Sequence, residues 1–100
     1  MEMTKKQEGS AMTIAVSGRI NATNAPQFGQ EVEEMIHGIT DLTFDFDQLD
    51  YISSAGLRML LVAQRTMNRQ GSMRIIHVHE DVYEVLEETG FTGITDVTMA

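Results

Sequence analysis

The chain has 100 residues, with fifteen acidic and seven basic side chains, a formal net charge of −8 and no cysteine. This composition disfavours a nucleic-acid partner, because phosphate binding needs clustered Lys and Arg, and it excludes disulfide and thiolate chemistry. Without a signal-peptide pattern or an apolar run of roughly 20 residues, the sequence predicts one cytoplasmic domain over residues 1–100, without a membrane partner.

Two strands are predicted at the start of the chain. Residues 3–7 fit a short edge strand, and a turn at residues 8–10 leads into residues 11–17, which are mostly apolar and partly β-branched. Gly18 is predicted to end this second strand. The two strands can pair as a hairpin, which makes this edge of the sheet antiparallel.

The first helix is predicted from its cap and its apolar stripe. Thr23 or Asn24 is expected to be the N-cap, Pro26 lies in the first turn, and Gly38 ends the helix. Glutamates and a glutamine occupy the other face. The apolar stripe repeats at three- and four-residue spacing. It consists of Ala25, Phe28, Val32, Met35, Ile36 and Ile39.

A buried strand and the longest helix are predicted in the middle of the chain. The helix begins after Ser53 or Ser54, runs to about Gln70 and is ended by Gly71. Its apolar stripe is wider than a core face needs, which is typical of broad burial and less often of a docking surface. The strand at residues 42–46 alternates, and three apolar side chains face one side of it: Leu42, Phe44 and Phe46.

The last part of the chain predicts a strand, a helix and a short final strand. These are residues 73–78, residues 81–88 and residues 94–99, with Thr-Gly-Phe at residues 89–91 as the C-terminal cap of the helix. Strands that alternate with helices imply an α/β fold. The predicted architecture is a mixed sheet of four to five strands packed with three to four helices.

Residues 51–58 place two serines, Ser53 and Ser54, between a strand and the longest helix. Free backbone N–H groups and the helix dipole favour negative charge at such a helix start. The preceding strand is expected to be central, so Ser54 would lie just beyond its carboxyl end, at a crevice where α/β sheets bind ligands and partners. Either serine can instead be a plain N-cap, because Ser is among the best capping residues.

No catalytic constellation is found in the chain, so we do not expect an enzyme. A serine hydrolase elbow needs a glycine two residues before the nucleophile, but Ile52 stands there, although Gly56 follows Ser54 by two. No glycine-rich phosphate loop is present either. Nucleotide is therefore not expected to bind to this chain.

Two groups of residues could bind a metal, but the signal is weak in both. His77 and His79 lie two residues apart at the end of one predicted strand, and histidines in such places more often face solvent. Asp45, Asp47 and Asp50 could collect Mg²⁺. Such carboxylates more often solvate a loop and favour a nearby helix N-terminus. We therefore expect no metal and no cofactor.

Four segments resemble the STAS family, and in particular its bacterial anti-anti-sigma factors. The most specific are residues 51–58, in which a serine precedes Ala-Gly-Leu, and residues 82–91, which end in Thr-Gly-Phe. Residues 14–26 and 42–61 are similar to the family's strand-and-helix segments, in the same order and spacing. The resemblance covers nearly the whole chain and implies a single STAS domain over residues 1–100.

The resemblance implies that Ser54 is phosphorylated by an anti-sigma factor that is a serine kinase and holds the ATP, and that a serine phosphatase removes the phosphate. The unmodified chain would bind this kinase and free a sigma factor, as an anti-sigma factor antagonist. Many family members have an acidic residue where this chain has Ser53 and an aspartate where it has Asn21, so local negative charge is reduced here. The predicted docking residues are Asn21, Asp50, Ser53, Ser54, Gly56, Leu57 and Arg58.

Two other functions remain open at this stage. A STAS scaffold or accessory regulatory subunit would act within an assembly without any sigma factor, and the proteins that co-purify with the chain would distinguish it. A small serine-based hydrolase would act on activated esters. Its activity would be lost in the Ser54→Ala variant.

Overall fold

The computed structural model describes residues 1–100, which form an α/β fold with six strands in one sheet. The strands are β1 (Glu2–Glu8), β2 (Ala11–Ile20), β3 (Asp41–Asp45), β4 (Leu49–Ile52), β5 (Ser72–Val78) and β6 (Asp96–Met99). The helices are α1 (Ala25–Met35), α2 (Ser54–Gln70), α3 (Glu80–Glu88) and the short 3-10 turn η1 (Phe91–Gly93).

The sheet is mixed, with the strand order β1-β2-β3-β5-β6 and with β4 paired to the end of β2. β1 and β2 form the predicted antiparallel hairpin, and every other pair is parallel. Parallel pairing requires crossover connections, which α1, α2 and α3 provide. The predicted fold class is confirmed, and β4 brings the sheet to six strands.

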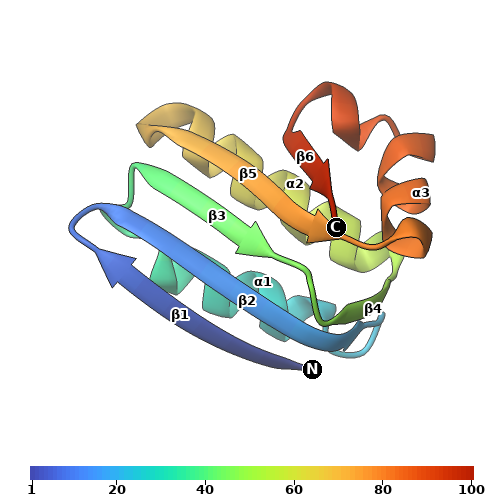
Figure 1. Cartoon of the computed structure of the whole chain (residues 1–100). Coiled ribbons are helices and arrows are strands. Elements are labelled where there is room, and N and C mark those ends of the chain that lie inside the picture. The colour runs from blue at the N-terminus through green and yellow to red at the C-terminus, as the bar shows by residue number, and fades with distance from the viewer.

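Two helices cover one face of this sheet (Figure 1). α1 and α2 lie together behind the strands, whereas α3 lies at the end of the sheet where β4 leads into α2. The buried face of α1 matches the predicted stripe except at Met35, which is only half-buried. α1 ends at Met35, before the predicted Gly38, whose φ of +76° places it in the following turn. None of the helices combines the length and the apolar composition needed to span a bilayer.

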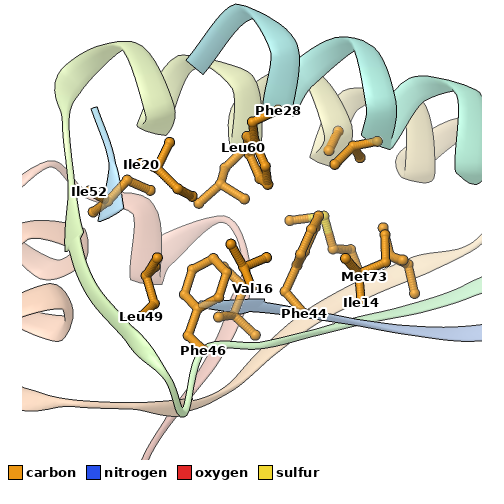
Figure 2. Packing of buried hydrophobic residues seen from close by; sticks show 14 of the residues in the cluster. Ile14, Val16, Ile20, Phe28, Phe44, Phe46, Leu49, Ile52, Leu60 and Met73 are labelled. Carbon is orange, nitrogen blue, oxygen red and sulfur yellow. The ribbon is translucent and has the colours of Figure 1, made fainter. Parts of the chain in front are cut away.

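Aromatic side chains form the centre of the core between the sheet and these two helices. Phe28 of α1 lies 6.0 Å from Phe44 of β3, measured between ring centroids, and Phe44 lies 5.9 Å from Phe46. Figure 2 shows Phe28 and Leu60 pointing from the helices toward these rings. Leu42, Phe44 and Phe46 are all fully buried, so the predicted alternation of this strand is confirmed.

Strand β4 lies where the sequence predicts no strand, between residues 42–46 and the longest helix. The prediction that Gly18 ends the second strand is wrong, because β2 continues to Ile20 past a register shift at Gly18, where φ is +88°. The Gly18 N–H donates to the Gln48 carbonyl at 2.9 Å, and the last residues of β2 then pair with β4. A bulge of this kind bends a strand away from its first partner. Ser54 therefore follows β4, not the central strand β3.

The C-terminal part differs from prediction mainly in its last strand. Gly90 has a left-handed φ of +79° and its N–H donates to the Glu87 carbonyl, as expected for a C-terminal cap of α3. Phe91 is buried against the core. Because η1 follows directly, β6 begins at Asp96 and is two residues shorter than predicted.

Candidate functional site

Ser53 is the N-cap of α2. Its backbone is extended, with φ −87° and ψ 170°, and its Oγ accepts a hydrogen bond from the Gly56 N–H at 3.1 Å. The Ser53 N–H donates to the Ile20 carbonyl at 2.8 Å, which ties the helix start to the end of β2. Ser53 is therefore occupied by local structure, as expected of a capping serine.

Ser54 occupies the first helical position of α2, and its side chain is exposed. It takes no part in the cap that Ser53 provides. No acidic residue lies in the first turn, so the partial positive charge of the helix N-terminus is not offset there. This arrangement leaves the Ser54 hydroxyl available to a second molecule, at a place that tolerates an added negative charge.

Gly56 is buried beneath this first turn. A Cβ atom at this position would lie 2.7 Å from Ile20 Cγ2 and 2.8 Å from Ile52 Cγ1, which is too close for any real contact. Figure 2 shows these two isoleucines side by side below the start of α2. Gly56 thus allows the first turn of α2 to pack closely against Ile20 of β2 and Ile52 of β4.

The remaining predicted docking residues do not all lie at this turn: Leu57 and Arg58 belong to α2, whereas Asp50 lines a separate pocket with residues 79–82. The pairing of Ile20 with Ile52 brings Asn21 close to the start of α2, but the Asn21 Oδ1 accepts from the backbone N–H groups of Thr23 and Asn24. Asn21 is half-buried and shapes its own loop. The other predicted residues are half-buried or open to solvent. They are Leu57, which is half-buried, and Asp50 and Arg58, which are exposed.

A shallow groove of about 320 Å³ lies beside Ser54, between the first turns of α2 and the segment that contains η1. We call it the α2–η1 groove, and four of its seven lining residues are apolar. Its lining residues are Ser54, Leu57, Arg58, Leu61, Thr89, Phe91 and Ile94. The last three come from the C-terminal part of the chain, which sequence reasoning did not connect with the site. The only sequence signal was the wide apolar stripe of the longest helix.

The family described as "Mlab, STAS domain" matches residues 3–97. A relative from Bordetella bronchiseptica, the candidate anti-sigma factor antagonist BtrV, is 34% identical over 99 residues, which cover 97% of this chain and 85% of the relative. The chain belongs to the STAS family. This confirms the resemblance drawn from residues 51–58 and 82–91.

Solved structures share the fold of this STAS domain at low identity. An anti-sigma factor antagonist from Mycobacterium paratuberculosis has a TM-score of 0.86 at 15% identity, covering 99% of this chain and 86% of that one. The antagonist SpoIIAA in its unphosphorylated form has a TM-score of 0.82 at 14% identity, with coverages of 96% and 87%. The phosphorylated form of Bacillus SpoIIAA has a TM-score of 0.74 at 13% identity, with coverages of 96% and 90%.

Two histidines and two aspartates of this STAS domain form two separate pairs. His77 Nδ1 lies 3.0 Å from Asp45 Oδ1, and His79 Nε2 lies 3.3 Å from Asp47 Oδ1. The two pairs join the ends of β3 and β5. No three His, Asp or Glu side chains are grouped so that they could hold a metal ion. Asp50 therefore does not complete a magnesium site with Asp45 and Asp47.

One carboxyl group has a perturbed acidity. The side-chain amide of Gln48 donates to Asp47 Oδ2 at 2.8 Å, and this hydrogen bond, followed by that of His79, lowers the pKa of Asp47 below its ordinary value. Asp47 is exposed in the loop that precedes β4, so the lowered pKa keeps this loop residue negatively charged to lower pH. It gives no sign of acid–base chemistry at Ser54.

Proposed function

We propose that this STAS domain, residues 1–100, is a cytoplasmic anti-sigma factor antagonist that works by partner switching. Unmodified, it binds an anti-sigma factor that is also a serine kinase, and so frees a sigma factor. The single observation that carries this proposal is the exposed Ser54 hydroxyl at the start of α2, next to a capping Ser53. The name of the Bordetella relative supports the same function.

The switch is the phosphorylation of Ser54. The Ser54 Oγ attacks the γ-phosphorus of ATP held by the partner, and the bond from that phosphorus to the β,γ-bridging oxygen breaks. ADP leaves, and the hydroxyl proton passes to a base on the kinase. This chain supplies the acceptor and no catalytic group. A serine phosphatase reverses the step, as water cleaves the phosphate ester and releases inorganic phosphate.

The added group changes the surface while the fold is retained. A phosphoserine carries about −1.5 to −2 charges at neutral pH, and the N-terminus of α2 stabilises negative charge. The similarity to SpoIIAA in both its phosphorylated and unphosphorylated forms supports a fold that survives modification. Release of the partner then follows from charge and bulk at the interface.

The test is a phosphorylation assay with the anti-sigma factors of the same genome. Each is incubated with this chain and ATP, and the phosphate is mapped by mass spectrometry. One phosphate on Ser54, absent from Ser54→Ala and retained in Ser53→Ala, supports the proposal. Phosphate mapped mainly to Ser53 contradicts the assigned acceptor. If no anti-sigma factor binds or phosphorylates the chain, the alternative of a STAS scaffold or accessory subunit is favoured.

A further inference from the structure

The α2–η1 groove is lined mainly by apolar side chains. Ile94, at its rim, is 54% exposed, the highest value among the large hydrophobic side chains. Leu57 and Leu61 are half-buried along α2, and the nearly buried Phe91 packs into the core. The Thr89 hydroxyl, which also lines the groove, donates to the carbonyls of Val85 and Leu86. An apolar side chain therefore fits this groove better than a polar one.

Arg58 is the only charged residue that lines the groove. It is exposed and takes part in none of the ion pairs of the chain, which involve Arg74, His77 and His79. A guanidinium that has no ion-pair partner within the chain and lies at an apolar groove is complemented by a carboxylate of a binding partner. Arginine binds carboxylates through two parallel hydrogen bonds, which adds directional specificity.

We propose that the α2–η1 groove receives an apolar side chain of the anti-sigma factor, and that a neighbouring carboxylate of the same partner segment pairs with Arg58. This inference rests on the proposed function and specifies the chemistry of the partner. The groove continues directly into Ser54, which lines it. A partner segment seated in the groove therefore holds the kinase next to its acceptor.

The same geometry explains how phosphorylation releases the partner. Ser54 and Arg58 are four residues apart on α2, so their side chains lie on one face of the helix. A phosphate on Ser54 is within reach of the Arg58 guanidinium, which it neutralises as an internal ion pair. The partner carboxylate then loses its counter-charge and faces a dianion instead. No change in the backbone is needed.

The binding test uses isothermal titration calorimetry with the anti-sigma factor that phosphorylates Ser54. Ile94→Glu is compared with Met99→Glu, which adds the same charge at a 47% exposed apolar residue of β6 outside the groove. We expect Ile94→Glu to weaken binding by about 20-fold or more and Met99→Glu by about twofold or less. Arg58→Gln should weaken binding about tenfold, and Arg58→Glu more. Circular dichroism checks folding, and Ile94→Thr replaces Ile94→Glu if the latter unfolds.

The test of the switch is a ³¹P NMR titration of the phosphorylated chain. The second pKa of the phosphoserine should be lower in the wild type than in Arg58→Gln, because the guanidinium favours the dianion. Equal pKa values in the wild type and in Arg58→Gln would overturn the proposed ion pair between the phosphate on Ser54 and Arg58. If Ile94→Glu and Met99→Glu bind the anti-sigma factor equally well, the groove is not its docking site. If Arg58→Glu binds more tightly than the wild type, Arg58 does not pair with a carboxylate of the partner. If Ser54→Asp still weakens binding in those cases, the proposed function stands without this inference.

Discussion

The Ser53 Oγ accepts a hydrogen bond from the Gly56 N–H at 3.1 Å, whereas the neighbouring Ser54 side chain is exposed. The two adjacent hydroxyls thus differ in their environment, because one is hydrogen-bonded within the helix cap and the other faces solvent. Ser53 satisfies one of the free N–H groups at the start of α2. Ser54 makes no such capping bond, and its side chain is open to solvent.

The division of tasks between the serines predicts different effects on stability. Ser53→Ala removes the cap and should lower the free energy of unfolding by about 1 kcal/mol. Ser54→Ala, the matched control, should lower it by less than about 0.5 kcal/mol, as is usual for exposed sites. Urea unfolding curves of the two variants measure both values. A larger loss at Ser54 than at Ser53 would contradict this assignment.

The proposed switch predicts opposite behaviour for two substitutions at Ser54. Ser54→Asp places a negative charge at the acceptor and should weaken binding to the anti-sigma factor by more than about 1.4 kcal/mol, or tenfold. Ser54→Ala should keep near-native affinity and cannot be switched off. Both circular-dichroism spectra should match that of the wild type. Equal affinities of the two variants would mean that phosphorylation here does not gate the complex.

Close packing under α2 predicts that Gly56 tolerates no side chain. In Gly56→Ala, the new methyl group meets Ile20 and Ile52 at less than 3 Å, so the helix start must shift. We expect a loss of about 1–3 kcal/mol in the free energy of unfolding, as for other overpacked sites. Gly93→Ala is the control, because a Cβ there meets nothing within 4 Å. Thermal unfolding of both variants would reveal equal stabilities if this packing account is incorrect.

The perturbed acidity of Asp47 predicts a measurable effect of its neighbour. Gln48→Leu removes the hydrogen bond that contributes most to the lowered pKa, so the pKa of Asp47 should rise. NMR titration of the carboxyl carbon measures this change, and Gln7→Leu, far along the chain, should leave it unaltered. Because the folded pKa is depressed, the stabilisation is present above the unfolded pKa. It is lost as the pH falls through the folded value.

The fold was predictable where a segment carries its own periodic pattern. Leu42, Phe44 and Phe46 alternate strictly, and all three are buried as expected. β4 has no such pattern, because Leu49 and Ile52 are buried while the two residues between them are exposed. Its pairing depends on the bulge at Gly18, a long-range feature that no local window contains.

The candidate site was predictable only in part for the same reason. The segment at residues 51–58 stands out by its residues, but each of the two adjacent serines could be the cap, and only the structure shows that Ser53 is. The groove beside Ser54 escaped prediction because Phe91 and Ile94 reach α2 from the far end of the chain. In the sequence, nothing distinguishes Phe91 and Ile94 from residues that are simply part of the core.

The bulged end of β2 has a consequence for any peptide reagent that copies the segment around Ser54. Residues 51–58 hold their shape because Ser53 is bonded to Ile20 and because the groove wall comes from the segment of Phe91 and Ile94. Helices shorter than about 12 residues are marginal in water on their own. A synthetic octapeptide of this segment therefore carries the proposed acceptor hydroxyl without the folded surroundings of Ser54. A kinase that recognises the folded surface around Ser54 would therefore phosphorylate folded chains and not unfolded or proteolysed ones.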